Sequence, residues 1–136
     1  MFKFYEFMYS KFYNGQRKLY PDSFSAQFTA MLGIATVQYL SLLCIILLSD
    51  EIFKTKIILI LATPISNIIM VLVAIILAIL NYKIYIGDKK LLHIKNKYKN
   101  ITKQKKMILS LLVWANIILI ILIFISALFF IDPNSY

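Results

Sequence analysis

Three long stretches without charge dominate this chain of 136 residues. Segments 23–49, 57–82 and 107–131 contain no Asp, Glu, Lys, Arg or His. Each has at least the roughly 20 residues with which an α-helix crosses about 30 Å of hydrocarbon. Hydrophobic residues make up 61% of the whole chain, whereas soluble domains contain about half. We therefore predict an all-α integral membrane protein with three transmembrane helices.

The segments outside these stretches are too short to fold alone. Independent folding below about 40 residues usually needs disulfides or metals, and the single cysteine, Cys44, lies within the first stretch. We therefore expect one membrane domain over residues 1–136. Its expected parts are an N-terminal amphipathic interfacial helix (1–20), three transmembrane helices (24–49, 57–82 and 107–131), a basic cytoplasmic loop (83–106) and a short tail (132–136).

The positive charge is concentrated beside the apolar stretches. Nine of the 15 basic residues lie between Lys83 and Lys106, and four precede Asp22. Basic flanks stay cytoplasmic, so we predict a cytoplasmic N-terminus and an outer C-terminus. The abundance of lysine and isoleucine indicates an AT-rich genome, and we expect the inner (plasma) membrane of a bacterium. The expected partner is the anionic cytoplasmic leaflet of the lipid bilayer rather than nucleic acid, with a soluble acidic partner as the alternative.

Two segments have the pattern of helices that lie on a membrane. At 100° per residue, most aromatic side chains of the first 20 residues share one face, opposite the basic and polar ones. In the basic loop, apolar residues recur at helical spacing after Asp88. The predicted lipid-surface contacts are Phe4, Tyr5, Met8, Phe12, Lys89, Lys90, Lys95, Lys97 and Lys99. The alternatives are that the aromatic residues pack on the protein's own helices and that the loop is a solvated connector.

Small residues are expected to mediate the packing of the first two spans. In lipid, helices associate through close backbone approach and interhelical hydrogen bonds. The predicted packing face consists of Ala26, Thr29, Ala30 and Gly33 in the first span and Ala62, Ser66, Ala74 and Ala78 in the second. Pro64 lacks a backbone N–H and is expected to kink the second span.

Each span also carries one amide side chain near its middle. Gln38, Asn67 and Asn116 lie roughly 14 to 22 Å from the cytoplasmic edge, counted at 1.5 Å per residue. An unpaired amide in hydrocarbon costs several kcal/mol. We therefore predict a midplane polar layer in which the three side chains bond to one another and set the helix register. The alternative is that they line a pore or a substrate path.

No pattern of residues in the sequence indicates catalysis. The lone His93 has no cysteine or carboxylate nearby to complete a metal site, and three glycines are too few for a phosphate-binding loop. The spans lack the ionisable groups that mark proton relays and ion sites. We therefore expect no enzymatic activity, no cofactor and no metal.

Two functions are consistent with these features. The first is a non-enzymatic, small multi-pass protein that acts through helix–helix association, as an accessory or structural subunit of a homo- or hetero-oligomeric membrane complex. The alternative is a homo-oligomeric pore-forming or membrane-perturbing effector, holin-like or part of antiphage defence. Three uncharged spans with a basic flank resemble the holin pattern, although the carboxyl terminus lacks the dense charge of that family. A toxin-immunity membrane protein would have the same features.

Overall fold

The computed structural model describes residues 2–53 and 63–130. Within these ranges the chain is helical, with no strand. The helices are α1 (Phe2–Gln16), α2 (Ser23–Phe53), α4 (Pro64–Tyr85), α5 (Asp88–Lys99) and α6 (Lys103–Phe130). Helices α2, α4 and α6 are long and apolar enough to cross a membrane. This confirms the prediction of an all-helical protein with three candidate transmembrane helices.

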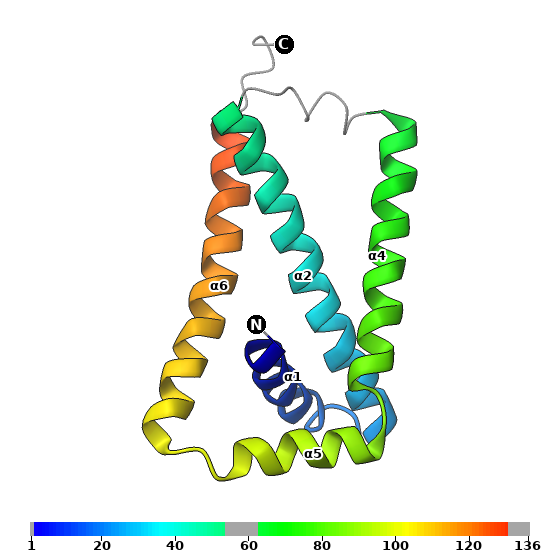
Figure 1. Ribbon diagram of the computed structural model, residues 1–136, viewed down its shortest axis with the longest axis vertical. Helices are drawn as coiled ribbons and strands as arrows, with labels where there is room; N and C mark the ends of the chain where they lie inside the picture. The colour runs from blue at the N-terminus through cyan, green and yellow to red at the C-terminus, as the bar shows by residue number, and fades with distance from the viewer. Residues whose placement is uncertain (1, 54–62, 131–136) are drawn as a thin grey trace.

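The three long helices α2, α4 and α6 form an open frame, with α2 between the other two (Figure 1). Helix α2 runs diagonally between α4 and α6, and it packs against both of them and against α1. Its lower end in the view lies beside α4 and its upper end beside α6. Helix α5 crosses the lower end of the frame, and α1 lies above it, between α2 and α6. The short helices therefore fill the end of the frame at which α2 and α6 diverge.

The core of the protein lies at this filled end. Among its described side chains, helix α1 buries Phe7, Met8, Tyr9 and Tyr13. Residues Leu91, Ile94 and Tyr98 of α5 are also buried within the protein, whereas the sequence predicted contact with the membrane surface or a solvated connector. The hydrophobic cluster is continuous with residues of α2, α4 and α6. The apolar side of α1 thus packs on the protein's own helices, as the alternative interpretation held.

This packing corrects one expected lipid contact. The side chain of Met8 is 0% exposed, so protein rather than lipid surrounds it. Phe4, Tyr5 and Phe12 are half-buried and pack against the same cluster. The physical reason is that α1 packs against both α2 and α6 at the end where these two helices diverge.

The second span begins differently from the expectation. Helix α4 starts at Pro64, and Thr63 before it is extended, with φ −78° and ψ 149°. The Thr63 hydroxyl accepts a hydrogen bond from the Ser66 backbone N–H at 3.3 Å. Proline at the first helical position removes no intrahelical hydrogen bond, so the expected kink at Pro64 is replaced by a helix start. Residues 57–62, including Ala62, lie outside the described residues.

The other helix ends also differ from the predicted boundaries. Helix α2 continues to Phe53, so Asp50 and Glu51 are helical instead of forming a turn. At the opposite end of the frame, the chain turns from α4 into α5 at Gly87, whose φ of 138° is open to glycine but strained for other residues. Asp88 then occupies the first turn of α5, where its charge suits the helix dipole.

Candidate functional site

A buried glutamine secures the corner between α4 and α5. Gln27 is 2% exposed. Its Oε1 accepts a hydrogen bond from the Gly87 backbone N–H at 3.1 Å, and its Nε2 donates to Asp88 Oδ1 at 3.2 Å and Ser23 Oγ at 3.0 Å. A polar residue one turn into an apolar span, as Gln27 is, weakly indicates such a role.

One predicted midplane amide has a partner that the sequence analysis missed. Asn81 Nδ2 donates to Gln38 Oε1 at 2.7 Å and also to the Leu77 carbonyl at 2.7 Å. Asn81 is 2% exposed, and its Oδ1 accepts no hydrogen bond within the described residues. At 1.5 Å per residue, Gln38 lies about 22 Å from the start of α2 at Ser23, whereas Asn81 lies only about 6 Å from the end of α4 at Tyr85. The two side chains meet because Gln27, four residues into α2, already lies beside Gly87 beyond the end of α4, and because α2 runs diagonally past α4 (Figure 1).

The predicted layer of three amides is not assembled in the described structure. Asn67 is exposed on α4, about 27 Å from Tyr85 along the helix. Asn116 on α6 is half-buried, and its Oδ1 is buried without a partner among the described residues. Helices α4 and α6 lie on opposite sides of α2 (Figure 1). This separation corrects the expectation that the side chains of Gln38, Asn67 and Asn116 bond to one another.

The small-residue face of α2 receives α1 as well as α4. Ala26 and Ala30 are buried and Thr29 is half-buried. At Gly33 the Phe12 ring of α1 comes so close that an added Cβ would lie 2.8 Å from Phe12 Cδ2. The small side chains therefore admit an aromatic helix rather than serving the second span alone.

On α4, the remaining predicted packing residues differ in burial. Ser66 is buried, whereas Ala74 and Ala78 are half-buried. Helices α2 and α4 do pack together, and the buried Asn81 joins them through its hydrogen bond to Gln38. Tyr85, which is equally buried, stacks on Tyr9 of α1 instead.

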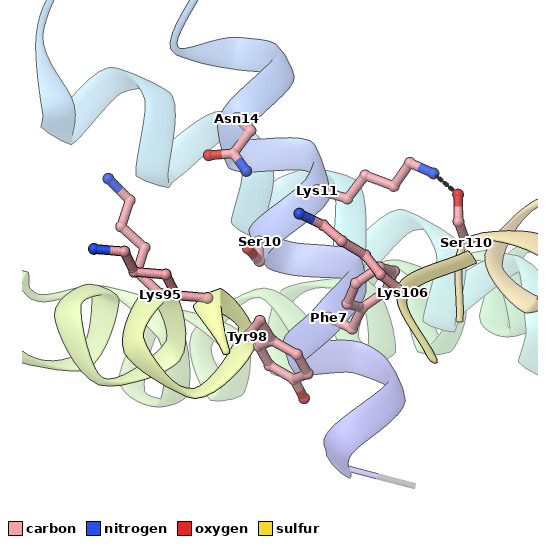
Figure 2. A pocket seen from close by; sticks show the side chains of 9 residues that line it. Phe7, Ser10, Lys11, Asn14, Lys95, Tyr98, Lys106 and Ser110 are labelled. Atoms are coloured by element: carbon pink, nitrogen blue, oxygen red, sulfur yellow. Dashed lines mark hydrogen bonds between the residues drawn. The ribbon is translucent and has the colours of Figure 1, made fainter. Parts of the chain in front are cut away.

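A lysine-lined cavity of about 360 Å³ lies between α1, α5 and α6. Figure 2 shows lysines from three helices around it, Lys11 of α1, Lys95 of α5 and Lys106 of α6. The lining residues are Phe7, Ser10, Lys11, Asn14, Lys95, Tyr98, Lys99, Lys106 and Ser110. These nine residues include four lysines and three hydroxyls but no carboxylate. We refer to this site as the lysine cavity.

Contacts within the protein fix two of these lysines. The Lys11 ammonium donates to Ser110 Oγ and lies 5.8 Å from the centroid of the Trp114 ring. The Lys95 ammonium lies 4.8 Å from the centroid of the Tyr13 ring. Aromatic faces attract cations, so these contacts hold both ammonium groups beside the cavity.

The nearby carboxylate of Glu6 is engaged with other groups. It accepts from Lys97 Nζ at 2.5 Å and lies 3.3 Å from the Tyr98 hydroxyl. That hydroxyl also donates to the Lys3 carbonyl at 2.7 Å. Burial and the Glu6 carboxylate raise the pKa of Tyr98 to about 12, so the phenol keeps its proton at neutral pH.

The predicted lipid-surface lysines are exposed. Lys89, Lys90, Lys95, Lys97 and Lys99 are all exposed on α5. The same helix packs against α1 and α4, and two of these lysines also contact α1, Lys95 at the Tyr13 ring and Lys97 at the Glu6 carboxylate. Contact of these lysines with lipid stays a prediction.

Among the described residues, no group of histidine, cysteine or acidic side chains is placed to hold a metal ion. His93 is exposed, and the buried Cys44 Sγ lies 3.9 Å from the Ile120 carbonyl. What the arrangement offers chemically is anion binding in the lysine cavity and hydrogen bonding between helices. Comparison of the chain with protein-family models, curated proteins and solved structures gives no significant match.

Proposed function

We propose that this chain is a non-enzymatic multi-pass membrane protein that acts through helix–helix association, as an accessory or structural subunit of a homo- or hetero-oligomeric membrane complex. The observation that carries the proposal is the open frame. Helices α4 and α6 flank α2 on opposite sides (Figure 1), and most of their large apolar side chains are exposed. Such a frame leaves two long helical faces available for neighbouring helices.

Unsatisfied amides on this frame favour a protein neighbour over lipid alone. The Oδ1 atoms of Asn81 and Asn116 are buried and accept no hydrogen bond within the described ranges. The protomer's own atoms cover both oxygens, so these side chains must turn outward before a serine, threonine or amide side chain of a neighbouring helix can donate to them, and lipid tails provide no donor at all. Burial of an amide without a donor costs about 1 to 3 kcal/mol, and a partner helix would recover this cost.

A groove between α2 and α4 supports the same proposal. Its volume is about 520 Å³, and its lining is mostly apolar, with Gln38, Ser41 and Asn81 among the residues. A transmembrane helix of another subunit, carrying a hydrogen-bond donor for Asn81, is the occupant that we propose.

The charge distribution supports the proposed orientation. Helix α5, which carries many of the lysines, crosses the end of the frame opposite the Phe53 end of α2 and the Pro64 end of α4 (Figure 1). By the positive-inside rule, this end and the N-terminus lie in the cytoplasm of a bacterial cell, and the C-terminus lies outside the inner membrane.

Substitution of Asn116 tests the association directly. Asn116→Leu removes an amide whose oxygen has no partner within the described chain, so it should not lower the stability of the protomer. It should weaken association about three- to twentyfold, the range expected for one interhelical hydrogen bond. Ile118→Leu is the matched control on the same helix, at an exposed position. The measurement is the concentration dependence of oligomer mass for protein extracted with its native lipids.

Two results would count against the proposal. A protein that stays a lone protomer in native-lipid particles and crosslinks to nothing in intact membranes is no subunit of a complex. Depolarisation of a bacterial host on regulated expression, followed with a membrane-potential dye, would instead favour the pore-forming alternative.

A further inference from the structure

We infer that the lysine cavity binds the phosphate headgroup of one anionic phospholipid, whose acyl chain runs along α6 beside Trp114. This inference is independent of the proposed association of helices. It differs from general attraction to an anionic leaflet because it assigns one lipid to named residues.

The first argument is the charge of the cavity. Lys11, Lys95, Lys99 and Lys106 line it from three helices, and Figure 2 shows three of these side chains arranged around α1. Within the described residues none of the four forms an ion pair. Basic pockets between helices at the cytoplasmic side are typical sites for anionic headgroups.

The second argument is the size and polarity of the cavity. A volume of about 360 Å³ accommodates roughly a dozen water molecules at ~30 Å³ each. A phosphate of five heavy atoms fills only part of this space, which leaves room for the rest of a headgroup. Ser10, Asn14 and Ser110 also line the cavity and can bond to headgroup hydroxyls.

The third argument is an apolar path that leads from the cavity into the bilayer. A second cavity, of about 270 Å³, shares Lys11 with the first and is lined by Val113, Trp114 and Ile117 of α6. These residues follow Ser110 at spacings of three, four and seven, so they continue along one side of the helix. Helix α6 rises about 10 Å from Ser110 to Ile117. Lys11 thus stands where a headgroup would end and an acyl chain would begin.

A phospholipid accounts for both cavities, whereas a free phosphate accounts for one. A soluble phosphate compound would use the lysines and leave the apolar path unused. An anionic phospholipid places its negative charge at the lysines of the first cavity and its acyl chain beside the apolar residues of the second. The charges and the apolar path together therefore favour a lipid as the source of the phosphate.

The test measures lipid binding to the full-length protein in detergent by native mass spectrometry. Phosphatidylglycerol and phosphatidylcholine are the two probes. We expect Lys99→Gln with Lys106→Gln to weaken phosphatidylglycerol binding roughly 25-fold, since each lysine near an anionic surface contributes about a factor of five. Binding of phosphatidylcholine should change less than about threefold. This lipid has no net charge, so removing lysine charges removes little attraction.

Matched variants separate the cavity from general electrostatics. Lys89→Gln with Lys105→Gln removes the same charge from the same two helices at exposed positions outside the cavity. This control should keep phosphatidylglycerol binding. Lys99→Arg with Lys106→Arg should also keep it, which shows that a loss in the glutamine variant reflects charge rather than misfolding.

The acyl path has its own test. Trp114→Ala should weaken binding several-fold, whereas Ile118→Ala, at an equally exposed position of α6, should not. Equal losses in the two lysine double variants, or equal affinities for the two lipids, would overturn the assignment of a site. If glycerol phosphate in solution displaces phosphatidylglycerol at a similar concentration, the ligand is a soluble phosphate and the lipid assignment is wrong.

Discussion

The contact between Gly33 and Phe12 allows a quantitative test of how α1 is held. A Cβ at Gly33 would lie 2.8 Å from Phe12 Cδ2 and 3.1 Å from Phe12 Cε2. Gly33→Leu therefore forces the ring of Phe12 away from α2. Overpacking of this kind costs about 1 to 3 kcal/mol, while replacing glycine within a helix recovers up to about 1 kcal/mol. After about 1 kcal/mol is recovered, we expect a net destabilisation of about 0 to 2 kcal/mol.

A double-mutant cycle isolates the steric part of this cost. In a Phe12→Ala background the ring is absent, so Gly33→Leu should be neutral or slightly stabilising through its helix propensity. Propensity cancels in the cycle, and the coupling energy should equal the steric cost of about 1 to 3 kcal/mol. Thr36→Leu, at an exposed position of the same helix, should show no coupling to Phe12→Ala.

The assay is reversible unfolding in mixed micelles, followed by the fluorescence of the single tryptophan. Trp114 reports on α1 because the Lys11 ammonium lies 5.8 Å from its ring centroid. A coupling energy below about 0.5 kcal/mol, the usual error of additivity, would refute the packing of α1 on the small-residue face of α2.

Three other substitutions probe contacts described above. Tyr9 is fully buried and stacks on Tyr85 at 4.8 Å, so Tyr9→Ala should lower the free energy of unfolding by about 3 to 5 kcal/mol, while Tyr9→Phe should cost only about 1. Gln38→Leu should lower the free energy of unfolding by about 0.6 to 1.7 kcal/mol, and by much less in an Asn81→Leu background. A double-mutant cycle measures this difference, and additive losses would show that the two side chains share no hydrogen bond. Burial and Glu6 keep the pKa of Tyr98 at about 12, against about 10 for a free tyrosine. The stabilisation from its protonated form is therefore complete below pH 10 and lost as pH rises through 12. Absorbance titration of the folded protein, minus that of the Tyr98→Phe variant, should show one tyrosinate appearing near pH 12. A difference curve centred at pH 10 would contradict the buried position of Tyr98.

The sequence by itself determined the three apolar helices and the helical character of the basic loop. Span length and the absence of charge are local properties, and the thickness of hydrocarbon sets the length that they must reach. The amphipathic spacing after Asp88 likewise depends only on helical periodicity, and the structure places Leu91, Ile94 and Tyr98 in helix α5. The start of α4 at Pro64 could also be predicted in principle, because Thr63 before a proline is a recognisable cap.

The tertiary structure alone decided which side chains meet. Gln38 bonds to Asn81 because α2 is tilted, and tilt follows from packing against several neighbours rather than from residue counting. The lysine cavity is lined by residues of α1, α5 and α6 together. No local sequence pattern predicts that these three helices meet. The aromatic face of α1 is the clearest case. Lipid and protein interior are both apolar, so the same amphipathic sequence suits either, and the packing of α1 against α2 and α6 places that face inside the protein.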